Sequence, residues 1–249
     1  MRISKGIIGL AIGLGLLLLL VANAPARLLL AVLPEQQLVL QGISGTLWQG
    51  RASRSLVAVE GGWLQLGATE WTLKPFSLLL LAPRLQLESH WGRQTLVADL
   101  TLRSANTIEM NNVDLRVDAG LLRQYLPLGL VGDVAAQFET LEIVDGMPVT
   151  ASGRIVWQEG GWISPQGRRS LGSYAVDLNS PEPGLIAGEV ITLAGDLTAQ
   201  GNVSLEQAQY RIDVTLEGSG LQDPQLSQAL QLVAAPVAGG FRVQLEGQL

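Results

Sequence analysis

The stretch that decides the fold is Tyr210-Arg211-Ile212-Asp213-Val214-Thr215-Leu216-Glu217, in which apolar and polar side chains alternate. Successive side chains of a β-strand point to opposite faces, so this stretch predicts a strand with one buried and one solvated face. The alternation recurs at 96–103, 113–118 and 241–246. Burial on one face is typical of antiparallel sheets, because parallel strands are usually apolar on both faces.

Turn residues separate these stretches. Glycine makes up 29 of the 249 residues, about twice its usual share. Turns with positive φ are predicted at Asp145-Gly146, at 60–62 and at Gly160-Gly161. A sheet of many strands twists, so we expect a mainly β protein with a long, strongly curved antiparallel sheet, open or folded over.

Two short helices are also predicted to pack on the sheet. One covers 119–126, with Asp118 as its N-cap and Pro127 at its end. The other covers 224–233, where Asp223 is the cap and a proline occupies the first turn.

An apolar segment, GIIGLAIGLGLLLLLVA at 6–22, precedes the β pattern. As a helix it would extend roughly 26 Å at about 1.5 Å per residue, which nearly crosses a bilayer core of about 30 Å. Arg2 and Lys5 come before it, so the positive-inside rule places the N-terminus in the cytoplasm. We therefore predict a transmembrane signal-anchor, with its lipid-facing residues including Ile7, Leu10, Leu16 and Leu20.

A cleaved signal peptide is the alternative, because Ala22-Asn23-Ala24 and Ala24-Pro25-Ala26 both resemble cleavage sites. Pro25 should hinder cleavage at the first site, which favours a retained anchor. Both interpretations export the rest of the chain. We therefore divide it into a cytoplasmic stub with the anchor at 1–27 and a periplasmic β-rich domain at 28–249.

Charge and cysteine content limit the possible partners. From Leu28 onward there are 13 basic and 22 acidic residues, a balance of 13 − 22 = −9, which argues against binding to nucleic acid. Cysteine is absent, so neither disulfides nor thiolate metal sites contribute.

Catalytic motifs are missing from the sequence. His90 is the single histidine, which argues against histidine-rich metal sites and most nucleophilic triads. Glu139, Glu142 and Asp145 lie close in sequence, but they alternate like solvated strand positions. No phosphate-binding loop, dinucleotide fingerprint or metalloprotease motif occurs. We expect no enzymatic activity, no cofactor and no metal.

The chain has six tryptophans, which invite two interpretations. Tryptophan fills β cores, and this is the favoured explanation. It is also enriched at interfaces, so a docking or lipid-facing surface stays open. The residues are Trp48, Trp63, Trp71, Trp91, Trp157 and Trp162.

One motif is more specific than these patterns. Gly45-Thr46-Leu47-Trp48-Gln49-Gly50-Arg51-Ala52, together with the anchor and Leu33-Pro34, resembles protein N of the type II (general) secretion pathway. Trp71-Thr72-Leu73-Lys74-Pro75 and Gly153-Arg154-Ile155-Val156-Trp157 extend the resemblance over most of the chain. Its motif residues are Gly45, Thr46, Leu47, Trp48, Gly50, Arg51, Trp71 and Pro75.

The resemblance implies a non-enzymatic component of the type II secretion system of a Gram-negative bacterium. Such a component is anchored in the cell inner membrane and assists export of folded exoproteins across the outer membrane. Its implied partners are other secretion components: the inner-membrane platform, the pseudopilus or secretin-linked proteins. Within the motif, we expect Gly45, Thr46 and Gly50 to bend a strand around Trp48 in the core, and Arg51 to cap the turn or contact a neighbour.

A lipid-binding or lipid-transfer module of the AsmA-like group is the alternative function. A curled sheet with an apolar inner face could hold acyl chains.

Overall fold

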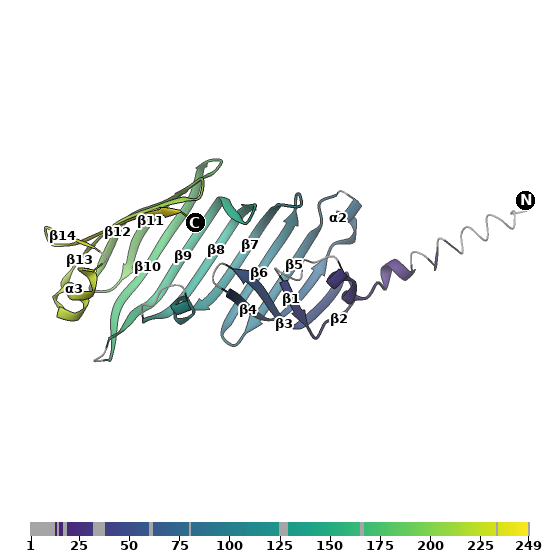
Figure 1. The fold of residues 1–249 in the computed structure, drawn as a ribbon, viewed down its shortest axis with the longest axis horizontal. Helices are drawn as coiled ribbons and strands as arrows, with labels where there is room; N and C mark the ends of the chain where they lie inside the picture. Colours follow the sequence, from purple (N-terminus) through teal and green to yellow (C-terminus); the bar gives the residue numbers. More distant parts are fainter. Residues whose placement is uncertain are drawn as a thin grey trace, which may run out of the picture. The chain divides into compact units, whose positions relative to one another are not determined.

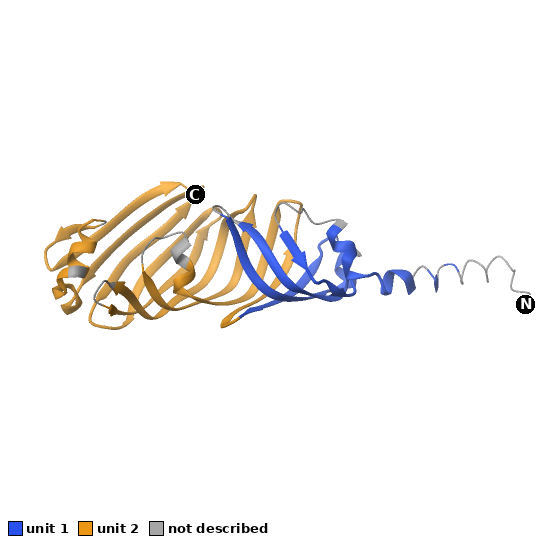
Figure 2. Ribbon diagram, turned by 60° about the horizontal axis from the view of Figure 1, so that its bottom comes forward, with its two compact units in different colours: residues 1–91 blue, residues 92–249 orange. Residues whose placement is uncertain are grey.

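The computed structural model describes residues 13, 15–16, 19–31, 38–59, 62–79, 81–124, 129–164, 167–232 and 234–248. The chain divides into two compact units, Met1–Trp91 and Gly92–Leu249 (Figure 2). Within each unit, neighbouring strands run antiparallel. The structure thus confirms a mainly β protein with antiparallel strands and short helices.

The first unit contains a sheet in the order β1-β3-β4-β5, with β2 paired to β3 (Figure 1). Two short helical segments, η1 and α2, accompany it. Its elements are η1 (Ala26–Ala31), β1 (Leu38–Gln41), β2 (Ser44–Gly45), β3 (Gln49–Val59), β4 (Gly62–Leu73), α2 (Pro75–Leu79) and β5 (Arg84–Trp91).

The second unit follows the chain from β6 to β13 and ends in the order β13-β15-β14. Its strands are β6 (Gln94–Leu102), β7 (Thr107–Asp118), β8 (Leu130–Val144), β9 (Met147–Ser164), β10 (Gly167–Glu182), β11 (Leu185–Ala194), β12 (Thr198–Glu206), β13 (Gln209–Glu217), β14 (Ala235–Val237) and β15 (Gly240–Gln248). Its helical segments are η2 (Ala119–Gln124), η3 (Ser219–Gln222) and α3 (Pro224–Leu230).

The alternation of side chains determines which face of each strand is buried. In β13 and β15 the register places Val214 opposite Val243 and Leu216 opposite Phe241 on the apolar face. The polar face between the same strands carries the Arg242–Asp213 and Arg211–Glu246 ion pairs. The strands predicted at 96–103, 210–217 and 241–246 are confirmed to within two residues at each end, and the stretch predicted at 113–118 is the second half of the longer strand β7.

Both predicted helices form, although one is a 3₁₀ helix. Asp118 Oδ1 accepts the Gly120 N–H at 2.7 Å at the start of η2, and Asp223 Oδ1 accepts the Leu226 N–H at 3.2 Å in α3. These carboxylates satisfy N–H groups that have no partner within the helix. Helix α2 was not predicted, although Pro75 at its first position is a helix-start signal.

The predicted turns have mixed outcomes. Asp145 and Gly146 have φ of 52° and 82° and join β8 to β9, as expected. Gly160 and Gly161 lie inside β9, so that prediction was wrong. Packing explains Gly160, because a Cβ atom there would lie 2.8 Å from both the Gly172 carbonyl oxygen and the Trp157 ring.

The predicted anchor lies largely outside the described residues. Ile7 and Leu10 are not described, whereas Leu16 and Leu20 are helical and are 58% and 72% exposed. Within the described part of the chain, none of the helices has both the length and the apolar character needed to span a membrane.

Candidate functional site

The motif of the first unit forms a tight hairpin between β2 and β3, which we call the clasp turn (residues 45–50). The Thr46 N–H donates to the Gln49 carbonyl at 2.8 Å, and the Gln49 N–H donates to Thr46 Oγ1 at 3.1 Å. Gly45 precedes the turn with φ of 90°, a conformation that glycine adopts without steric cost. Leu47 and Trp48 therefore form the tip.

One side of the clasp turn holds the segment that follows the N-terminal helix. The Leu47 N–H donates to the Ala24 carbonyl at 2.8 Å, and Trp48 Nε1 donates to the Val21 carbonyl at 2.9 Å. Pro25 forms an isolated antiparallel bridge with Thr46. Residues 21–25 are thus bonded to a turn that lies more than twenty residues later in the sequence.

The other side of the clasp turn holds the sheet. The Leu47 carbonyl accepts a hydrogen bond from Trp71 Nε1 at 3.2 Å, and the Trp48 carbonyl accepts one from the Leu73 N–H at 2.7 Å. Both donors belong to β4. The two tip residues, Leu47 and Trp48, therefore connect residues 21–24 to β4.

Trp71 is the aromatic core residue of the first unit. It is 6% exposed and packs with Ala26 and Ala52, while Leu40, Leu85 and Leu87 lie around this cluster. Gly50 is opposite Trp71, and a Cβ atom there would lie 2.4 Å from the indole ring. Glycine at position 50 is therefore needed to make room for the ring.

The expectation that Trp48 fills the core was wrong. Trp48 is only half-buried, because it sits at the tip of the turn and its N–H reaches the Val21 carbonyl. Trp71 fills the core instead. Of the remaining tryptophans, Trp157 and Trp162 are half-buried, and Trp63 and Trp91 are exposed, so burial explains only part of the set.

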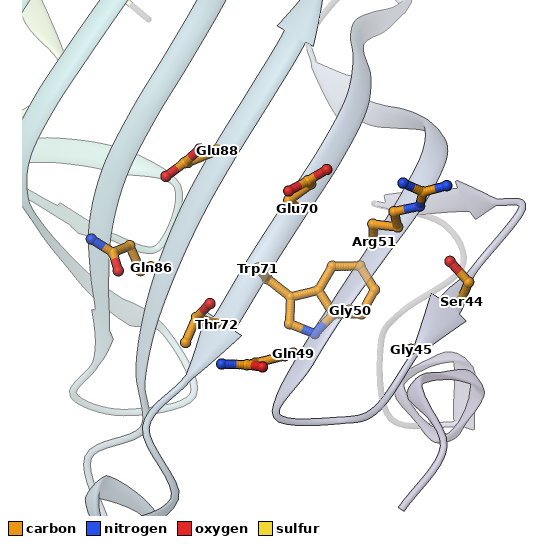
Figure 3. Close-up of a pocket in the computed structure, with 10 residues that line it drawn as sticks. All are labelled: Ser44, Gly45, Gln49, Gly50, Arg51, Glu70, Trp71, Thr72, Gln86 and Glu88. Carbon is orange, nitrogen blue, oxygen red and sulfur yellow. The ribbon is translucent and has the colours of Figure 1, made fainter.

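Arg51 follows Gly50 along β3, so strand alternation turns its side chain to the opposite side of the sheet from that of Gly50. It pairs in register with Glu70, which in turn pairs with Glu88, so an arginine and two carboxylates follow one another across three strands. These side chains line an open hollow of about 420 Å³. Figure 3 shows the residues that line the hollow around Arg51.

The motif residues fall into three places. Those from 45 to 50 form the clasp turn, and Trp71 packs beneath it. Arg51 lines the polar hollow. Pro75 is exposed and begins α2, just beyond the strand end that the clasp turn holds.

The carboxylates considered for catalysis do not form a site. Glu142 pairs in register with Glu109, which is bonded to Arg103, and Asp145 lies in the β8–β9 turn, where it accepts a hydrogen bond from Asn106. His90 is exposed on β5. Among the described residues, no group of three acidic, histidine or cysteine side chains could hold a metal ion.

In the second unit, one set of charged groups spans neighbouring strands. Arg154 on β9 forms a two-bond pair with Asp177 on β10, and its Nη2–Oδ2 bond is 2.7 Å long. Arg242 makes the same kind of pair with Asp213. Hydrogen bonding to the guanidinium groups lowers the pKa of both carboxyl groups. These exposed pairs fix strand register rather than a reacting group.

The hydroxyl group of Tyr174 is buried in the core of the second unit. Tyr174 packs with Val190 and Ala199, and its ring centroid lies 5.9 Å from that of Trp157. Its hydroxyl donates a hydrogen bond to carbonyl oxygens, Leu171 at 2.6 Å and Leu197 at 3.0 Å. Burial raises the pKa of Tyr174 to about 12, so the hydroxyl stays protonated and acts as a structural donor.

Comparison with known proteins identifies the family. The model of the family "Type II secretion system (T2SS), protein N" matches residues 36–244, from just before β1 into β15. The chain belongs to the type II secretion system protein N family. The resemblance carried by the motif residues is thereby confirmed.

Two curated relatives of the type II secretion system protein N family are similar over most of the chain. The protein of that name from Aeromonas hydrophila is 25% identical over 92% of this chain and 93% of its own length. The one from Vibrio cholerae is 27% identical over 79% of this chain and 81% of its own length. No solved structure matches.

Sequence reasoning missed the partners of the clasp turn. Val21 and Ala24 offer only backbone carbonyls to it, and a backbone acceptor leaves no mark in the sequence. The apolar segment of α2 was also missed, although its run of leucines between two prolines was visible.

Proposed function

We propose that the chain is a non-enzymatic component of the type II secretion system, anchored in the inner membrane, that assists export of folded exoproteins through protein–protein contacts. On this proposal, residues 1–27 form the cytoplasmic stub and anchor, and residues 28–249 lie in the periplasm. The family match over residues 36–244 is the observation that carries the proposal.

The clasp turn supports an anchored protein. A flexible linker after the apolar segment would leave the β units free to move relative to the membrane. Instead, two hydrogen bonds from Leu47 and Trp48 fix residues 21–24 against the sheet. Anchor and sheet are therefore joined at a defined point, as expected for a part that must hold its position within a larger assembly.

Polar faces favour protein partners over an enclosed lipid. The hollows around Arg51, around Arg93 and Arg116, and around Arg211 are lined largely by charged and amide side chains. Such surfaces offer directional hydrogen bonds, which give specificity in protein recognition. The AsmA-like lipid alternative would instead use the apolar face around Tyr174 and Val190.

Export assays test the proposed function. In a deletion strain, secretion of a folded exoprotein should fall and should recover when the full-length chain is supplied. A variant whose residues 1–20 are replaced by a cleavable signal peptide is the matched control, since it delivers the same β units, with Val21 and Ala24 still available to the clasp turn, but without the anchor. Unchanged export in the deletion strain would contradict the proposal.

Photocrosslinking identifies the partner class. A photoreactive residue at Asn202, exposed on the polar face of β12, should capture another secretion component in whole cells. The same residue placed at Val203, on the apolar face, should capture none. Recovery of phospholipid alone with the purified full-length protein, with no protein cross-links, would favour the lipid alternative.

A further inference from the structure

The loop between β4 and β5 exposes apolar side chains. Its sequence, Pro75-Phe76-Ser77-Leu78-Leu79-Leu80-Leu81-Ala82-Pro83, is almost wholly apolar and lies between Lys74 and Arg84. We call residues 74–84 the α2 loop. Phe76 is 81% exposed and Leu81 is 86% exposed, and Leu78 is exposed as well.

The α2 loop is closed at its base by hydrogen bonds, which fix the backbone that carries the exposed Phe76 and Leu81. The Lys74 N–H donates to the Arg84 carbonyl at 2.9 Å. The buried Ser77 hydroxyl donates to the Lys74 carbonyl at 2.5 Å and accepts the Arg84 N–H at 2.8 Å. A loop fixed in this way exposes Phe76 and Leu81 beyond the end of β4.

The α2 loop lies near the residues that follow the apolar N-terminal segment. Helix α2 and η1 are found at the same end of the first unit, the end at which residues 19–25 lie, in both views (Figures 1 and 2). The hydrogen bonds agree, because Leu73 and Trp48 join the start of the loop to the turn that binds Val21. Leu28 and Leu30 of η1 are also exposed at this end.

Charge complementarity selects a lipid surface as the occupant. Lys74 and Arg84 are exposed at the two ends of the apolar stretch, and Lys74 is one of only two lysines in the chain. An apolar tip between two cations matches a bilayer, in which phosphate headgroups lie above acyl chains. The rest of the exported part is acidic, so this local balance is distinctive.

We propose that the α2 loop is a second membrane contact, in which Phe76, Leu78 and Leu81 enter the surface of the bilayer while Lys74 and Arg84 bind lipid phosphates. The proposal rests on the anchoring of residues 6–22 stated under Proposed function. With one helix across the bilayer and one loop in its periplasmic leaflet, the first unit would be held in a fixed orientation instead of turning about a single anchor.

Single labelled cysteines test this contact in the full-length protein, since the chain has no cysteine of its own. The protein is placed in vesicles of phosphatidylethanolamine and phosphatidylglycerol, with an environment-sensitive fluorophore on Phe76→Cys or Leu81→Cys. Trp63→Cys is the matched control, because Trp63 is also apolar and exposed but begins β4, roughly 30 Å of strand away from the loop. Leu16→Cys reports the anchor.

Quenching by a phospholipid that carries a nitroxide on its acyl chain is the readout. The Phe76 and Leu81 probes should be quenched by about twofold or more, and the Trp63 probe should not be quenched. A quenched Leu16 probe with unquenched loop probes would overturn the second contact and leave the anchor standing. Quenched loop probes with an unquenched Leu16 probe would support the contact and contradict the anchor.

Two further results separate the alternatives. A blue shift of the Phe76 probe without lipid quenching would indicate a second copy of the chain and would overturn the proposal. Lys74→Gln with Arg84→Gln should lower the quenching at Phe76 by about twofold, because the headgroup contacts are lost. Unchanged quenching in this variant would overturn the role assigned to the two cations.

Discussion

The cores of the two units share one packing arrangement, a tryptophan ring over a glycine, but differ in the hydrogen bonds beside the ring. In the first unit Trp71 covers Gly50, and in the second unit Trp157 covers Gly160, so in both cases an aromatic ring takes the space that a side chain would need. The difference lies in the polar atoms. Trp71 Nε1 bonds to the clasp turn, whereas the Tyr174 hydroxyl beside Trp157 bonds within its own sheet region.

The core tryptophan of the first unit is therefore bonded to the turn that also binds Val21, whereas the buried hydroxyl of the second unit bonds within that unit. Changes in the Trp71 cluster should therefore affect both the sheet and the segment after the N-terminal helix. Changes around Tyr174 should affect only the second unit.

The largest effect is expected for Trp71→Ala. Removing this buried indole should lower the free energy of unfolding by about 3–5 kcal/mol, because a large cavity opens and the Leu47 carbonyl loses its donor. Urea unfolding followed by circular dichroism measures the change. Trp63→Ala, in the same strand but exposed, should cost less than about 1 kcal/mol. Equal losses would contradict the assignment of Trp71 as the core residue.

Tyr174→Phe should have the next largest effect. The substitution keeps the ring but removes the hydroxyl hydrogen that the Leu171 and Leu197 carbonyls share, which should cost about 1–3 kcal/mol of unfolding free energy. Tyr210→Phe is the control and should cost under about 0.5 kcal/mol, since its hydroxyl makes no hydrogen bond in the part of the chain the structure describes. Similar losses in both variants would show that the buried hydrogen bonds contribute little.

Trp48→Phe tests the clasp directly. Loss of the bond to the Val21 carbonyl should cost about 1 kcal/mol locally, which corresponds to roughly fivefold faster opening of residues 21–27. Limited trypsin cleavage after the exposed Arg27 measures this opening. Trp157→Phe loses a comparable bond, to the Val131 carbonyl, in the second unit and should leave cleavage at Arg27 unchanged. Faster cleavage in both variants would mean that the two regions are not distinct.

The smallest effect concerns acid stability of the second unit. Arg154 lowers the pKa of Asp177 below its ordinary value of 3.8 in the folded chain. The stability that this pair contributes is present above the unfolded pKa and is lost as the pH falls through the folded pKa. Asp177→Asn should therefore flatten the fall of unfolding free energy below about pH 4. Arg154→Gln should do the same, and a fall as steep as in the unchanged chain in both variants would contradict this origin.

Local patterns in the sequence were sufficient for the strands and the helix caps. Alternation at 210–217 predicted β13, and Asp118 and Asp223 predicted two helix starts, because each signal acts within a few residues of itself. The turn predicted at Gly160-Gly161 was wrong because these glycines serve contacts with residues that are distant in the sequence. Its glycines make room for Trp157 and for a neighbouring strand, and the sequence does not distinguish such a packing need from a turn.

The residues of the candidate site were named from the sequence, but their arrangement was not predicted. Its motif residues do gather at one end of the first unit, yet the roles of Trp48 and Trp71 are exchanged relative to expectation. Two tryptophans of the same motif set have equal tendencies to be buried. Which of them fills the core depends on the position of Gly50 across the strand pair, and that is a matter of register.

The class of the fold, its alternating faces, the lack of recognisable catalytic motifs and the family could be predicted from the amino-acid sequence, because these depend on residue type and short-range spacing. Only the tertiary structure decided that the clasp turn binds residues 21–25 and that the α2 loop lies at the same end of its unit. The physical reason is that these contacts join backbone groups and strand ends far apart in the chain, and their partners are chosen by the pairing of strands.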